Sequence, residues 1–160
     1  MKKIIIAIAA LLTALLVGAQ NTSSETKTVQ YHFFTNNIPS DWNYPLIGFV
    51  NKVDGNHASV QVGIVNTTSG NFGGVQGGFI NKVGGNVVGM QSGFFNRVEA
   101  EFQGIQNGFI NKTTANFSGI QTGFINLNSK NVYGIQSGFV NASTQSVYGL
   151  QCGFVNRAEE

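Results

Sequence analysis

The side chains that could carry out acid–base, nucleophilic or metal chemistry are few in this chain. His32 and His57 are the only histidines, Asp41 and Asp54 the only aspartates, and Cys152 the only cysteine. A nucleophilic triad needs a base and an orienting acid beside the nucleophile, and a bound metal needs several ligands close together. No spacing in the sequence assembles either set, and His57 takes the place of an apolar residue in an early repeat. We therefore expect a protein that is not an enzyme, with no catalytic residue, cofactor or metal site, in which His57 is structural or exposed.

The polar side chains that do recur are carboxamides, and they recur at a fixed step of fifteen residues. Each carboxamide both donates and accepts hydrogen bonds, so a stacked column of them can satisfy itself. We treat them as structural repeat positions. They are Gln61, Gln76, Gln91, Gln106, Gln121, Gln136 and Gln151, together with Asn51, Asn66, Asn81, Asn96, Asn111, Asn126, Asn141 and Asn156.

A fixed period of this length predicts a repeat architecture whose units bury a core only against one another. Each unit carries glycines such as Gly134 and Gly138, and a glycine inside a helix costs about 1 kcal/mol relative to alanine. The valine, isoleucine and phenylalanine between them favour short strands. Charges fall only in the connectors between a repeat Asn and the next apolar residue, so the connectors face water. The sequence predicts an all-β fold.

The favoured fold is a β-solenoid with one coil per fifteen residues. Coils would stack about 4.8 Å apart, and equal positions would lie directly above one another. We then expect inward apolar stacks at the positions of Val132, Ile135 and Phe139, and amide ladders at Asn141 and Gln136. Gly134 and Gly138 would mark bends where a Cβ does not fit.

The alternative fold is an up-and-down antiparallel β-barrel with one strand of about ten residues per unit, a length that crosses a membrane. Alternate residues from Val132 to Val140 read the same in both directions about Gln136, so antiparallel neighbours would meet in matching layers. Ser137, however, falls in the middle of the opposite face, which is a weak feature for a lipid-facing strand.

The chain divides into three parts. Residues 1–19 read as a signal peptide, with two lysines, an uncharged run and small residues at a cleavage site. Residues 20–45 are expected to form a tail, a short strand at 29–34 and a loop at 35–44, with Trp42 and Tyr44 capping the first repeat. Residues 46–160 are the tandem repeat domain.

The chain after the leader is electrically neutral, since seven lysines and arginines balance seven aspartates and glutamates. It has no basic patch, and we expect no nucleic-acid partner.

The segment from Gly134 to Asn141 follows the pattern G-x-Q-x-G-x-x-N. In tandem at this spacing, the pattern resembles bacterial surface-repeat proteins, and the resemblance covers about residues 47–156. It implies an exported protein on the cell surface or outer membrane of a Gram-negative-type bacterium, with no activity or ligand specified. Leu46 and Ser59 depart from the pattern. A weaker likeness to curlin repeats is limited to Q-x-G-x-x-N.

These observations predict a non-enzymatic exported repeat protein that acts as a structural or adhesive display scaffold. The expected partner is a ligand on the cell envelope or on a host surface, with membrane association or end-to-end self-association as further options. The alternative functions are a small outer-membrane β-barrel and an amyloid-like fibre subunit.

Overall fold

The computed structural model describes residues 32–159, which contain strands and no helix. The predicted signal peptide at 1–19 and the first part of the predicted tail lie outside the described residues. The strands are β1 (Thr35–Ile38), β2 (Leu46–Ile47), β3 (Val50–Val53), β4 (His57–Val62), β5 (Val65–Thr68), β6 (Phe72–Val83), β7 (Val87–Val98), β8 (Phe102–Thr113), β9 (Phe117–Asn128), β10 (Val132–Ser137), β11 (Val140–Ser143), β12 (Val147–Cys152) and β13 (Val155–Ala158).

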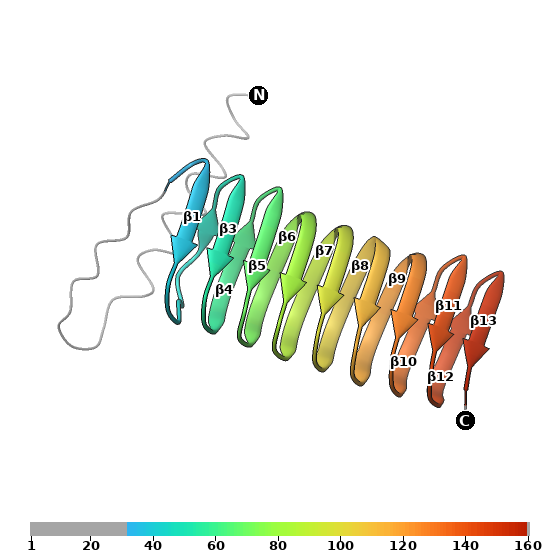
Figure 1. The fold of residues 1–160 in the computed structure, drawn as a ribbon. Coiled ribbons are helices and arrows are strands. Elements are labelled where there is room, and N and C mark those ends of the chain that lie inside the picture. The colour runs from blue at the N-terminus through green and yellow to red at the C-terminus, as the bar shows by residue number, and fades with distance from the viewer. Residues whose placement is uncertain (1–31, 160) are drawn as a thin grey trace. The chain divides into compact units, whose positions relative to one another are not determined.

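Strand pairing follows the fifteen-residue step of the sequence. In β6 and β7, Phe72 lies opposite Val87 and Gln76 opposite Gln91, and this offset of fifteen holds in each pair of strands. Every one of these pairs is parallel, as the stacked arrows in Figure 1 show. The β-solenoid is thereby confirmed. The antiparallel barrel is wrong, because consecutive repeats run in the same direction.

Each coil is a flattened loop with two faces and two corners (Figure 1). In one coil, β10 forms the first face and β11 the second face, with Gly138 and Phe139 between them. We call this turn and its equivalents the aromatic corner. Residues 144–146 and their equivalents connect the second face to the next coil, and we call them the polar corner. In the middle coils one strand, such as β6, runs through the aromatic corner without a break.

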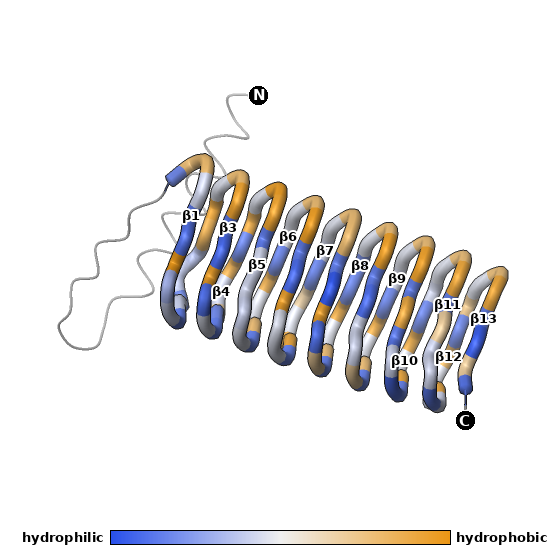
Figure 2. The backbone as a smooth tube through the Cα atoms, in the orientation of Figure 1, coloured by the Kyte–Doolittle hydropathy of each residue, from blue (hydrophilic) through white to orange (hydrophobic). Residues whose placement is uncertain are grey.

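Four columns of side chains fill the interior. They are the columns of Val132, Gln136, Asn141 and Ser143, all of which are buried. The first column is mostly apolar and contains His57, Phe72, Val87, Phe102, Phe117 and Val132; the Gln and Asn columns are polar throughout. Because side chains alternate between the two sides of a strand, the residues next to these columns, such as Tyr133, Ile135 and Ser137, point outward. Figure 2 shows the resulting mixture of polar and apolar positions along each coil.

The expected inward stacks are correct for Val132 and wrong for the other two positions. Ile135 is 41 % exposed and Phe139 is 46 % exposed. Gln136 points inward, so its neighbour Ile135 must point outward by strand alternation. Phe139 lies at the corner, outside the two packed faces.

The repeat glycines leave no room for a side chain, as expected. A Cβ on Gly134 would overlap the carbonyl of Gly119 in the preceding coil, and Gly134 has a φ of 138° that favours glycine. A Cβ on Gly138 would overlap the carbonyl of Gly123 and the side-chain amide of Asn126. The pattern G-x-x-N therefore reflects a packing need, since the glycine makes space for the Asn ladder. Only Gly138 lies at a bend, because Gly134 is inside β10.

The N-terminal segment begins the solenoid earlier than the sequence predicted. Residues 35–38 form β1 instead of a loop, and the described residues 32–34 are not in a strand. In β1, Asn36 lies opposite Asn51 and donates to its Oδ1 at 2.8 Å. Pairing along β3 outweighs the turn tendency of the asparagines in this segment. Farther along, Trp42 pairs with His57 in an isolated parallel bridge.

Candidate functional site

The repeat asparagines form a continuous ladder inside the solenoid. Each Nδ2 donates to the Oδ1 of the next Asn along the chain at 2.8–2.9 Å. From Asn51 to Asn141, the same Nδ2 also donates to a backbone carbonyl eleven residues further on, at 2.8–3.0 Å. These amides are saturated by the protein itself, so the ladder holds the coils together and offers nothing to an external ligand.

The repeat glutamines form a second ladder that runs in the opposite sense. Each Nε2 donates to the Oε1 of the preceding Gln at 2.6–2.9 Å, from Gln151 down to Gln61. Gln61 to Gln136 are fully buried. A buried polar group without a partner costs about 1–3 kcal/mol, and the ladder avoids this cost at each internal position.

A third row of amides lies at the polar corner, and sequence reasoning missed it. The Oδ1 atoms of Asn56 and Asn71 accept the backbone N–H fifteen residues on, both at 2.8 Å, and Asn86 does the same for Glu101 at 3.0 Å. Asp41 holds the corresponding place one coil earlier and accepts from the Asn56 N–H at 2.7 Å. This contact lowers the pKa of the Asp41 carboxyl. The recurrence of asparagine at this step was the signal for the row.

The titratable residues named at the outset are dispersed. His57 is buried and its ring stacks on Phe72 with centroids 5.5 Å apart. Burial lowers its pKa, and neither ring nitrogen has a hydrogen-bond partner. Cys152 is an exposed free thiol. Among residues 32–159, no group of three His, Cys, Asp or Glu side chains comes together as a metal site would require.

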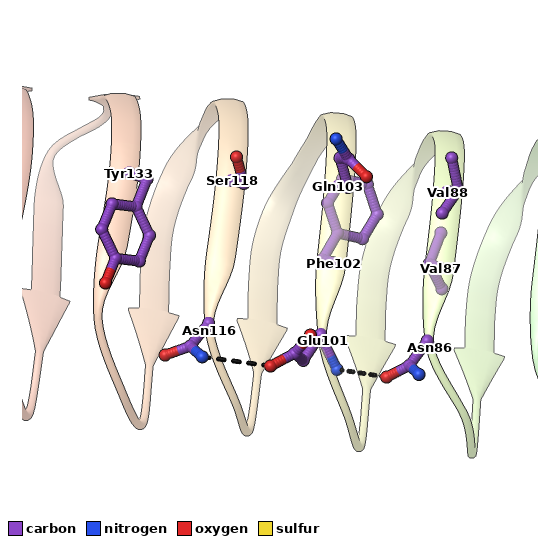
Figure 3. A pocket seen from close by; sticks show the side chains of 9 residues that line it. All are labelled: Asn86, Val87, Val88, Glu101, Phe102, Gln103, Asn116, Ser118 and Tyr133. Carbon is purple, nitrogen blue, oxygen red and sulfur yellow. Dashed lines mark hydrogen bonds between the residues drawn. The ribbon is translucent and has the colours of Figure 1, made fainter.

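A shallow hollow of about 370 Å³ lies on the first face beside the polar corner (Figure 3). Val88, Gln103, Ser118 and Tyr133 line it in four successive coils, and the small side chain of Ser118 lies between the larger ones of Gln103 and Tyr133. Glu101 borders the hollow and accepts a hydrogen bond from Asn116 Nδ2 at 3.1 Å. The hollow thus combines one carboxylate, several amides and one phenol ring, a set that can form hydrogen bonds with a polar group but supplies no paired acid and base.

The second face carries a basic row at the position of Ala142. Its members are Lys52, Lys82, Arg97, Lys112 and Arg157. Lys52 pairs with Asp54 at 2.9 Å and Arg97 with Glu99 at 2.6 Å, and Arg157 pairs with Glu159. These ion pairs are solvent-accessible and contribute little to stability.

The aromatic corner exposes a large apolar side chain in successive coils. Phe79, Phe94, Phe109, Phe124 and Phe139 stack in one row with ring centroids 4.9–5.0 Å apart. Figure 2 shows hydrophobic residues at this corner in successive coils. The exposed surface of the solenoid is therefore a set of straight rows with one residue per coil, and the phenylalanine row is the most uniform of those described above.

No helix within residues 32–159 is long and apolar enough to cross a membrane. No protein-family model, curated protein or solved structure matches this chain.

Proposed function

We propose that this chain is a non-enzymatic, exported repeat protein that serves as a structural or adhesive scaffold. The observation that carries the proposal is the unbroken fifteen-residue register, which turns each outward position into a straight row. A surface of this kind suits multiple weak contacts with an extended partner, such as a cell envelope or a host surface.

Two further features support a scaffold. The interior is occupied by the amide ladders and the apolar column, so the outward rows are what remains for contact with other molecules. Those rows are held by hydrogen bonds between coils at every level, which keeps their spacing fixed. Export is supported by the composition of residues 1–19 and by the resemblance to bacterial surface-repeat proteins.

The proposal is tested by locating the chain in a Gram-negative-type host that expresses the full sequence. An epitope inserted between Gly84 and Gly85 lies at the polar corner, where an insertion leaves the columns of both faces intact. We expect antibody to label intact cells, and we expect mass spectrometry to find a mature chain that begins at Gln20.

The matched control places a charge in the leader by Leu12→Arg. This change should prevent export and abolish labelling of intact cells while labelling of lysed cells remains. Labelling of wild-type chain only after lysis would contradict export. A reaction catalysed by the purified chain and lost on Glu101→Gln or Cys152→Ser would contradict the non-enzymatic role.

A further inference from the structure

The row of phenylalanines at the aromatic corner is half exposed to solvent, and forming a coil does not require phenylalanine at this position. The rings of Phe79, Phe94, Phe109, Phe124 and Phe139 are 44–55 % exposed. They contact one another along the row and are open to solvent on the outer side. The same position is isoleucine at Ile64, so stacking of rings is not a condition for forming a coil.

A second apolar row runs parallel to the first on the adjoining first face. Its members are Val75, Met90, Ile105, Ile120 and Ile135, which are 39–45 % exposed. Between the two rows lies a line of smaller side chains, Gly77, Ser92, Asn107, Thr122 and Ser137. No charged residue occurs in any of these positions. We call the two apolar rows and the line between them the apolar strip.

The area of the apolar strip is that of an interface. A phenylalanine has about 200 Å² of surface, so five rings at this exposure present about 450 Å². An aliphatic side chain has about 120 Å² of surface, which follows from about 3 kcal/mol for full burial at about 25 cal/mol per Å². Five such side chains at 39–45 % exposure add about 250 Å². The sum of about 700 Å² exceeds the largest apolar patch of an ordinary monomer, about 300–600 Å². Two such strips facing each other bury about 1,400 Å², within the range of stable dimers.

We propose that the apolar strip is the contact surface for a second copy of this chain. The occupant is identified by its spacing, because the rings repeat every 4.9–5.0 Å. A partner that covers five successive rings equally well must repeat at the same interval, and a second solenoid of the same coil height does so. The strip has no charge, so two identical strips meet without like-charge repulsion.

The symmetry of the contact follows from its self-complementarity. Two identical strips close into a dimer when a two-fold axis relates them, and the contact is then isologous. With the solenoids antiparallel, the two-fold axis runs across the rows, so the phenylalanine row of one copy faces the phenylalanine row of the other. The middle ring, Phe109, lies near the axis and therefore near its counterpart. This inference goes beyond the proposed scaffold function and does not depend on export.

The experiment compares the mass in solution of full-length wild-type chain with that of the triple variant F94T/F109T/F124T. We expect a dimer for wild type at micromolar concentration and a monomer for the variant, with a dissociation constant raised at least about 100-fold. Threonine is chosen because it is β-branched and suits a strand. Circular dichroism and thermal midpoint confirm that the variant keeps its strands.

The matched control is R97T/K112T/L127T, which changes the same three coils three residues further on, on the second face. Threonine occurs naturally at this position as Thr67, and we expect the control to remain dimeric. Equal dissociation in variant and control would overturn the assignment to the apolar strip.

A second measurement does not depend on the triple variant folding. In a Cys152→Ser background, Phe109→Cys should form an intermolecular disulfide under mild oxidation, whereas Ser69→Cys at the polar corner should not. Three outcomes would overturn the proposal. They are a monomeric wild type, cross-linking at both sites alike, and a monomer that binds neutral phosphatidylcholine vesicles through the same phenylalanines.

Discussion

The buried Asn ladder predicts a large and local loss of stability when one member is removed. In Asn96→Ala, Asn111 Oδ1 and the carbonyl of Asn107 each lose a donor at 2.8 Å, and Asn81 Nδ2 loses an acceptor at 2.8 Å. Asn81 Nδ2 keeps one bond, to Ser92 O, so two or three groups are left short of a partner. At about 1–3 kcal/mol for each unsatisfied buried group, the expected loss is about 3–5 kcal/mol.

The control for this change is Asn71→Ala at the polar corner. Asn71 also spans to the next coil, because its Oδ1 accepts a hydrogen bond from the Asn86 N–H at 2.8 Å, but Asn71 is exposed and water can replace it. We expect a loss below about 1 kcal/mol. Guanidinium unfolding followed by circular dichroism measures the difference, and amide hydrogen exchange tests whether the coils around residue 96 open first. A loss for Asn96→Ala within 1 kcal/mol of the control would refute the reasoning that burial makes the ladder costly to break.

Three further predictions follow from single features of the fold. Gln106→Leu should cost more than Gln61→Leu in urea unfolding, because Gln106 lies inside its ladder with two amide bonds, whereas Gln61 ends it; equal losses would contradict this. Gly104→Ala should lower the thermal midpoint strongly, since the new Cβ would overlap a carbonyl of the preceding coil at a φ of 137°, whereas Gly77→Ala has no atom within 4 Å of its Cβ and should change little. Burial lowers the folded-state pKa of His57 below its ordinary value near 6.5, so the folded chain binds a proton less readily than the unfolded chain. Stability should therefore fall as pH drops below about 6.5. His57→Phe should weaken this pH dependence in thermal melts from pH 8 to pH 5, and an unchanged pH profile would rule out His57 as its source.

Much of the architecture could be predicted from the sequence because the repeat has no insertions. A coil of constant length stacks equal positions, so the amides of Asn141 and Gln136 were expected to form ladders, and they do. The glycines beside them were expected to lack space for a Cβ, and the structure agrees.

The inward and outward assignment of apolar residues could not be predicted from hydrophobicity. Ile135 and Phe139 were expected inside because they are apolar, but the coil interior holds only four columns. Once Gln136 occupies one of them, strand alternation turns Ile135 outward. Hydrogen bonding between equivalent amides of neighbouring coils decides that Gln136 points inward. This effect exists only in the stack of coils and cannot be seen in a single repeat.

Local turn signals do not decide the structure at the N-terminal side. Asn36 and Pro39 suggested a loop, yet residues 35–38 pair with β3. The triplet from Phe34 to Asn36 repeats that from Phe49 to Asn51 in two of three residues, and this was the available signal. The hollow beside Glu101 depends on side-chain sizes in four neighbouring coils, so no single repeat could reveal it.

The opposed senses of the two internal ladders have an electrostatic consequence. The Asn side-chain dipoles point one way along the axis and the Gln side-chain dipoles point the other way, so their electric fields largely cancel in the buried interior. Within each ladder, every hydrogen bond polarises the next one and strengthens it. Rotating one carboxamide by half a turn would set donor against donor on one side and acceptor against acceptor on the other. Each ladder therefore has one direction of hydrogen bonding, which all its members share. That direction can be reversed only for the whole ladder at once.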